Sequence, residues 1–117
     1  CTASGKLFLA HLALIEQKAY LHRLELKAFT KNSITDVSVL KTELETSKRQ
    51  GFGIDNEEFV TGMAAIAVPI YDPKDSSKVL ATVACHAVTA RTSLSKLLSY
   101  RPVMAQAATE IATLLQS

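Results

Sequence analysis

Two apolar segments, residues 63–72 and 79–88, constrain the fold of this chain more than any other feature. The polar residues 73–78 join them, and this order is typical of a β-hairpin with a longer loop. Each segment is too short to cross a membrane, which needs about 20 apolar residues. The sequence therefore predicts two adjacent antiparallel strands.

Pairing Tyr71 with Lys78 divides the residues of the hairpin between two faces of a sheet, because opposite residues share a face. One face is apolar and is expected to pack on a helix: Ala64, Ile66, Val68, Ile70, Val79, Ala81, Val83 and Cys85. The other face is small and mildly polar: Met63, Ala65, Ala67, Thr82, Ala84 and His86. This register places Ala65 opposite Ala84 and Met63 opposite His86. A face of small side chains leaves volume unfilled, so we expect a ligand there.

Segments with helical periodicity lie at both ends of the chain. Residues 4–28 carry apolar side chains at three- and four-residue spacing, with Ser4 as the expected N-cap and a bend or a second helix after Leu12. Residues 93–116 form a second apolar stripe. Pro102 is expected to kink or divide this helix near Arg101, because its ring removes a hydrogen-bond donor.

The segment from residue 34 to residue 51 is the clearest single helix. Asp36 opens it, and Gly51 follows two cationic residues at its end, as is typical of a helix C-terminus. A short β-like stretch, residues 51–54, comes next. The predicted order is therefore α, α, β, β, β, α, which indicates an α+β domain with an antiparallel sheet.

Length and charge limit the function classes. The 117 residues suffice for one domain, and 13 basic against 11 acidic side chains give a net charge of +2. This charge is too small to imply nucleic-acid binding. Two cysteines cannot form a disulfide framework, which favours a reduced, cytoplasmic setting. The chain begins with Cys1 rather than Met, has no signal-peptide pattern, and is expected to be a fragment.

Two polar segments are candidate binding elements. Residues 2–6 open a helix, where free backbone N–H groups and the helix dipole favour an anion, although a plain capped helix start explains them as well. Residues 55–58 are an acidic cluster, for which a solvated turn is the usual explanation. Asp55 directly follows Ile54 and is expected to point inward at the end of a strand.

The remaining reactive side chains form no recognisable catalytic or metal-binding pattern. Cys85 and His86 are neighbours on a strand and point to opposite faces, so they cannot form a thiolate–imidazole pair. Cys85 is expected in the core, and His86 is either a satisfied core histidine or a donor to a carboxylate. The spacing of Cys1, Asp55 and His86 matches no zinc site, so no metal and no cofactor is expected.

Five segments carry motifs that occur together in one protein family: residues 3–7, 32–44, 49–58, 62–70 and 79–88. In this order they resemble the GKALLA helix, the TITD…L…EL segment, the RQGYAxDxEE stretch, the GxxCIAAPI strand and the VVAALSVSGP strand of the IclR-type transcriptional regulators. The resemblance spans nearly the whole chain.

The resemblance implies a GAF-like fold, an antiparallel sheet flanked by helices, and a ligand-sensing role rather than an enzymatic one. Residues 1–117 would be the C-terminal portion of a single effector-binding domain. Family members bind a small organic acid or an aromatic metabolite, and binding alters tetramer assembly or promoter occupancy. The implied partners are therefore a carboxylate or aromatic acid, a second copy in a homodimer or homotetramer, and DNA only through an absent N-terminal domain.

The same resemblance implies the site residues. The helix start supplies Ala3 and Ser4, and Asp55 takes the place of the family's pocket acid. Ala65 stands where many members have a pocket Cys, and Ala84 and His86 stand where they have two serines. Together with Met63 on the same face, the expected effector-binding residues are Ala3, Ser4, Asp55, Met63, Ala65, Ala84 and His86.

The alternative is a small GAF-like thiol or redox enzyme that uses Cys85 or Cys1. Such a cysteine should be exposed, near a cation and reactive in the native protein. The sequence leaves open the effector, the operator, and whether the regulator represses or activates.

Overall fold

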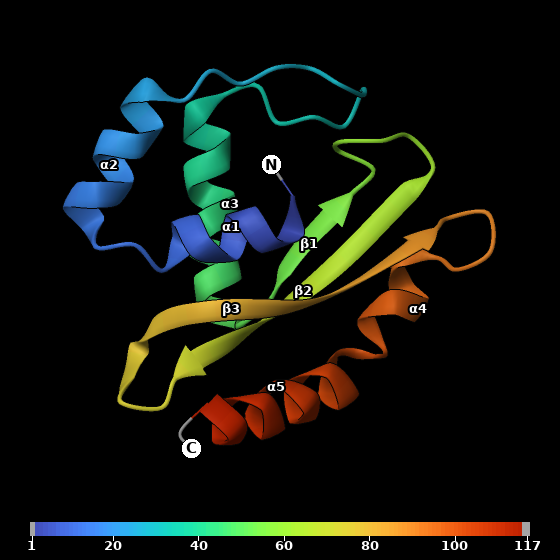
Figure 1. Cartoon of the computed structure of the whole chain (residues 1–117). Helices are drawn as coiled ribbons and strands as arrows, with labels where there is room; N and C mark the ends of the chain where they lie inside the picture. The colour runs from blue at the N-terminus through green and yellow to red at the C-terminus, as the bar shows by residue number, and fades with distance from the viewer. Residues whose placement is uncertain (1, 116–117) are drawn as a thin grey trace.

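The computed structural model describes residues 2–115, and its centre is a three-stranded antiparallel sheet in the order β1-β2-β3 (Figure 1). The strands are β1 (Gly53–Asn56), β2 (Met63–Asp72) and β3 (Asp75–Val88). One face of the sheet is covered by α1 (Ala3–Ala10), with α2 (Leu14–Arg23) and α3 (Val37–Gln50) beside it, and the other by α4 (Leu94–Leu98) and α5 (Arg101–Leu115). The predicted α+β class is confirmed.

The first predicted helix divides into two, as expected, but its ends differ from the prediction. The N-cap is Thr2 rather than Ser4, because Thr2 Oγ1 accepts a 3.0 Å hydrogen bond from Gly5 N–H. The second half ends at Arg23 rather than at residue 28. Leu24 and Leu26 both pack on the core of the helical layer, and this two-residue spacing suits an extended chain.

The helix that follows begins and ends where the sequence predicts. Asp36 caps it by accepting a 2.8 Å hydrogen bond from Ser38 N–H, and Gly51 closes it in the left-handed region at φ 83°. Hydrogen bonds from Ser38 hold the pKa of Asp36 below its ordinary value. The carboxylate cap therefore stabilises the fold above the unfolded-state pKa, and this contribution is lost as the pH falls through the folded-state pKa.

The C-terminal helix is divided near Arg101, as predicted. The first part ends at Leu98, and the second begins at Arg101, with Pro102 in its first turn. A helix leaves its first N–H groups unpaired, so proline is tolerated at this position. Within residues 2–115, no helix is both long enough and apolar enough to span a membrane.

The predicted strand register is wrong by two residues. β2 and β3 pair Ala65 with His86 and Ala67 with Ala84, rather than Ala65 with Ala84. The expected loop is shorter, because β3 already begins at Asp75, and register shifts beside Tyr71 take up the difference.

A shift of two residues leaves each side chain on its predicted face, because the side-chain period of a strand is two. Val79 lies beyond the register shift and pairs with Tyr71 rather than with Ile70. The predicted apolar face is otherwise confirmed. Its side chains form a core with α4 and α5. The buried residues of this core are Ala64, Ile66, Val68, Ile70, Leu97, Met104 and Ala108.

The face of small side chains packs directly on the first helix. Ala3 and Leu7 of α1 form one buried cluster with Ala65 and Ala67 of β2. A Cβ atom at Gly53 of β1 would lie 2.4 Å from the carbonyl oxygen of Ala3. The expectation of unfilled volume is therefore wrong at the centre of this face, where small residues let the helix backbone approach the sheet.

This close approach predicts the effect of adding one methyl group. Gly53→Ala should lower the free energy of unfolding by about 1–3 kcal/mol, because the backbone carbonyl that it meets cannot rotate away. Gly51→Ala is the control, since its Cβ meets nothing within 4 Å and its cost is confined to the left-handed backbone. Urea unfolding measures both variants, and a Gly53→Ala protein as stable as the parent would contradict the packing described.

Candidate functional site

Three predicted site residues form a row across the sheet. Asp55 of β1 pairs with Ala65 of β2, and Ala65 pairs with His86 of β3. Paired residues share a face, and neighbouring strands lie about 4.8 Å apart, so Asp55 and His86 flank Ala65 on the side of α1. We call these three residues the cross-strand row. Asp55 is buried, whereas His86 is exposed.

The first turn of α1 adjoins this row. Ala3 is buried against Ala65, and the half-buried Ser4 accepts a 2.9 Å hydrogen bond from the hydroxyl of Thr82 on β3. Gly5 N–H and Lys6 N–H are used by the Thr2 cap. The N–H groups of the first two helical residues are the ones that a helix leaves available to an anion.

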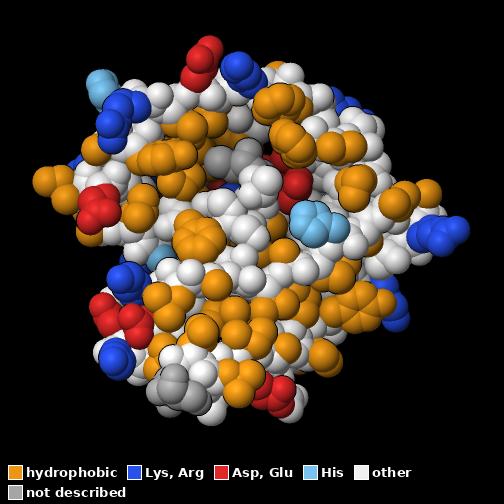
Figure 2. Space-filling view, viewed as in Figure 1, with side chains coloured by type: hydrophobic (Ala, Val, Ile, Leu, Met, Phe, Trp, Pro, Cys, Tyr) orange, Lys and Arg blue, Asp and Glu red, His pale blue; other side chains and the backbone are white. Residues whose placement is uncertain are grey.

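The two remaining predicted residues lie on the exposed part of the same face. Ala84 pairs with Ala67 and is exposed, and Met63 pairs with Val88 at the end of the sheet and is 38% exposed. Figure 2 shows this side of the molecule with a recess that has acidic side chains and a histidine at its rim and hydrophobic side chains around it. Five of the seven predicted residues therefore lie on one face of the sheet, and the other two, Ala3 and Ser4, lie at the start of the helix that covers the centre of this face.

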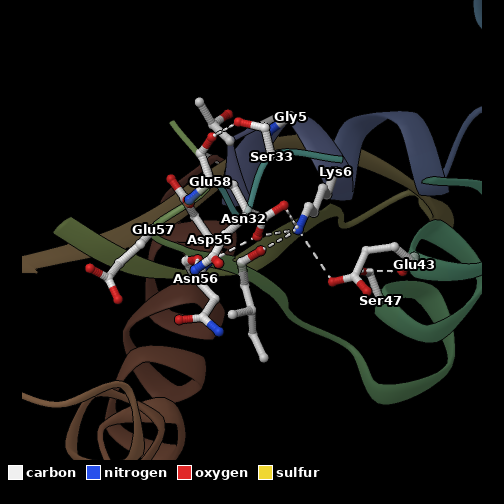
Figure 3. Close-up of polar contacts among 12 residues, drawn as sticks. Gly5, Lys6, Asn32, Ser33, Glu43, Ser47, Asp55, Asn56, Glu57 and Glu58 are labelled. Atoms are coloured by element: carbon white, nitrogen blue, oxygen red, sulfur yellow. Dashed lines mark hydrogen bonds and ion pairs between the residues drawn. The ribbon is translucent and has the colours of Figure 1, made fainter. Parts of the chain in front are cut away.

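A buried lysine that the sequence analysis missed lies beneath this site (Figure 3). Lys6 is 0% exposed, and its Nζ donates to the carbonyl oxygen of Ile54 at 2.7 Å, to Glu58 Oε2 at 2.8 Å and to Glu43 Oε1 at 3.2 Å. Glu58 Oε1 is also 2.8 Å from the ammonium as an ion-pair contact, but accepts no hydrogen bond within the described residues. We call this group the Lys6 cluster.

The Lys6 cluster fixes the turn that carries Asp55. Glu58 N–H donates to Asp55 Oδ1 at 2.9 Å, and Glu58 Oε2 accepts from Asn56 N–H at 2.9 Å. Glu57 between them has φ 55°, in the left-handed region. The inward position of Asp55 is confirmed. The interpretation of residues 55–58 as a solvated turn is wrong for Glu58, which is buried and paired with Lys6.

The loop between α2 and α3 holds this turn, residues 55–58, from the outside. Its side chains donate to the backbone carbonyls of the turn: Thr30 to Glu57 at 2.6 Å, Asn32 to Asn56 at 2.9 Å and Ser33 to Glu58 at 2.5 Å.

The sequence did contain a signal for the burial of Lys6. Ala3, Leu7 and Ala10 form the apolar stripe of α1, and Lys6 lies on that stripe by helical spacing.

Cys85, which the alternative reading needs as a reactive thiol, is partly buried and packs against the apolar core. The Lys6 cluster lies on the other face of the sheet, on the side of α1. Cys1 lies outside the described residues. Within residues 2–115, no three His, Cys, Asp or Glu side chains are grouped so that they could hold a metal ion.

Comparison with known proteins places the fold and the site in context. The sequence model of the family described as bacterial transcriptional regulator IclR C-terminal matches residues 1–113. The probable transcriptional regulator SauR of Cupriavidus necator is 33% identical over 111 residues, which are 95% of this chain and 43% of SauR. The chain thus spans less than half the length of this curated relative.

Two solved structures have the same fold. The Thermotoga maritima IclR is 38% identical with a TM-score of 0.86, over 99% of this chain and 46% of that one. A double mutant of the Acinetobacter PobR inducer-binding domain, in complex with 3-hydroxybenzoic acid, is 26% identical with a TM-score of 0.89, over 97% of this chain and 64% of that one.

Removal of the buried ammonium should strongly destabilise the chain. Lys6→Met should lower the free energy of unfolding by about 3–5 kcal/mol, because it leaves the Glu58 carboxylate buried without a counter-charge. Lys6→Met combined with Glu58→Gln should recover part of this loss. Lys41→Met on the exposed face of α3 is the matched control. Denaturant unfolding of the variants tests this, and equal losses for Lys6→Met and Lys41→Met would refute the structural role of Lys6.

Proposed function

Because this chain belongs to the IclR family of bacterial transcriptional regulators, we propose that it is the ligand-sensing part of such a regulator. In this proposal it binds a small carboxylate or aromatic acid and performs no chemistry on it. The observation that carries the proposal is the position of the cross-strand row beside the first turn of α1. The PobR domain with 3-hydroxybenzoic acid supports the ligand class.

The site has complementary groups for such a ligand. A carboxylate would accept hydrogen bonds from the free N–H groups of Ala3 and Ser4, where the helix dipole favours negative charge. His86 supplies a further donor from β3, and its exposure leaves it accessible. Asp55 has one oxygen engaged by Glu58 N–H, so the other can accept from a hydroxyl group of the ligand.

Binding would act on transcription by a shift between two states. A ligand changes an equilibrium only through its different affinities for the two states. The cross-strand row joins all three strands, and α1 touches each of them, so a ligand between α1 and the row would bias their relative position. This differential affinity, transmitted to subunit arrangement, would change promoter occupancy.

We also propose that residues 1–117 are the C-terminal portion of a larger cytoplasmic regulator. β3 pairs only with β2 among the described residues, and its 14 residues form a long sheet edge. An unpaired edge of this length is a template for a further strand. The match covers 43% of SauR, which is consistent with a larger regulator. DNA binding would then belong to a segment outside residues 1–117.

The position of the ligand can be tested by added bulk. Ala84→Leu should abolish binding of 3-hydroxybenzoate, or of the acid that binds best in a panel of small carboxylates, without unfolding the chain, because Ala84 is exposed on the site face. Ala90→Leu adds the same bulk in the turn after β3 and should bind like the parent. Calorimetric titration measures both, and equal affinity in the two variants would place the ligand elsewhere.

The chemistry of the site can be tested by pH. A protonated imidazole gives an anion a charge-assisted hydrogen bond, so the affinity of the parent should be higher at about pH 5.5 than at about pH 8. His86→Ser should still bind but lose this dependence, since a serine hydroxyl does not titrate in this range. Calorimetry at both pH values compares the two proteins. A variant that retains the pH dependence would exclude His86 as the titrating contact.

A further inference from the structure

A cavity beside β1, the edge strand of the sheet, borders the Lys6 cluster. It encloses about 440 Å³ between β1 with its following turn, the loop before α3, α3 itself and the start of α4. Its lining has a polar part and an apolar part, which are Asn32, Glu43, Asn56 and Glu58, and Ile34, Val39, Ile54 and Leu94. None of the seven predicted effector-binding residues lines it. We call it the β1 cavity.

The hydrogen bonds around Lys6 leave one oxygen on this side without a donor. The ammonium has three N–H groups. Four oxygens lie within 3.2 Å of it, which are the carbonyl oxygen of Ile54, Glu43 Oε1 and both oxygens of Glu58 (Figure 3). Glu58 Oε1 accepts no hydrogen bond within residues 2–115, although the Glu58 side chain is only 8% exposed. A buried oxygen in this position favours a further donor.

The charges are unbalanced in the same sense. Two carboxylates, those of Glu43 and Glu58, contact the single ammonium of Lys6. Lys6 donates to one oxygen of each, and this leaves Glu43 Oε2 and Glu58 Oε1 without a hydrogen bond from it. Both glutamates line the β1 cavity, so the unmatched negative charge borders the cavity. A donor that enters the cavity should therefore be a cation.

The oxygens that remain distinguish between kinds of cation. A metal ion would need more ligands, since no three His, Cys, Asp or Glu side chains of the described part of the chain are grouped to hold one. A guanidinium group prefers both oxygens of one carboxylate in a fork. Here the remaining oxygens come from two carboxylates, and single oxygens suit a compact ammonium with three donors. Asn32 donates through its amide nitrogen to Asn56 O at 2.9 Å, so its amide oxygen is left to accept.

We propose that the β1 cavity binds a small primary amine in its protonated form. The ammonium group donates to the oxygens of Glu43 and Glu58 that Lys6 does not use. The apolar body of the amine packs on Ile34, Val39 and Leu94. Val39 is 53% exposed without a ligand, so covering it removes apolar surface from water.

A water molecule accounts for these features less completely than an amine does. Water would supply the missing hydrogen bond to Glu58 Oε1. It would neither neutralise the second carboxylate nor cover the apolar part of the cavity. An amine with an apolar body does all three, and it is a ligand of a different charge, at a different site, from the acid proposed for the cross-strand row.

Titration of the unmodified chain with hexylamine tests the proposal. An alkylamine resembles a lysine side chain, whose pKa is about 10.4, so it is a cation at neutral pH. Its Kd should be about 1 mM or lower. Hexan-1-ol has the same apolar body without the charge, and hexyltrimethylammonium has the charge without N–H donors. Each should bind at least about tenfold more weakly than hexylamine.

Nuclear magnetic resonance gives both the affinity and the place of binding. In spectra of the ¹⁵N-labelled chain, the largest shift changes with hexylamine should fall on the amides of Ile34, Val39, Ile54 and Leu94. Failure of hexylamine to saturate, or shift changes centred on another surface, would overturn the proposal. Equal affinity for hexan-1-ol or hexyltrimethylammonium would overturn it as well. No acid effector is present in these titrations, so their outcome does not depend on the effector site.

A charge-neutral variant tests the role of the second carboxylate. Glu43→Gln keeps an oxygen that can accept from Lys6 but removes the unmatched charge, so hexylamine should bind about tenfold more weakly or worse. Glu45→Gln removes the same charge from the exposed side of α3, outside the cavity, and should bind like the parent. Circular dichroism checks that both variants are folded. Equal affinities in the two variants would refute the proposal, and if Glu43→Gln failed to fold, the comparison of the three ligands on the parent would still decide it.

Discussion

The Lys6 ammonium is the interaction on which the arrangement of this domain depends. It is buried, so its desolvation must be offset by direct partners. Its three acceptors come from β1, from the turn after β1 and from α3. One side chain of α1 therefore fixes three separate parts of the chain, and an alternative packing would leave charges buried and unpaired. Asp55 owes its position to this cluster, because Glu58 holds Lys6 with its carboxylate and Asp55 with its N–H.

The charge can be buried only because the backbone of α1 approaches the sheet closely. Gly53 has no side chain where the carbonyl oxygen of Ala3 lies, and Ala65 and Ala67 present only methyl groups. Larger residues would lift the helix from the sheet and open the Lys6 cluster to water. The small residues thus serve packing at the centre of the face, and only toward β3, where Ala84 and His86 are exposed, do they leave a surface for a ligand.

Features with a local cause were predictable from the sequence. The cap at Asp36, the end at Gly51 and the break near Pro102 depend on neighbouring residues, and the faces of the hairpin depend only on strand parity. The exact register was not predictable, because a shift of two residues conserves parity and the irregular pairing beside Tyr71 leaves no sequence pattern. Glu58 was misread as solvated because its partner, Lys6, lies 52 residues away in the chain.

The first turn of α1 borders the cross-strand row. An eight-residue helix anchored by a buried ion pair cannot deform freely, so a displacement at its start is transmitted along the whole helix. In the proposed function, a ligand at the row would therefore bias the position of α1 through its different affinities for the two states.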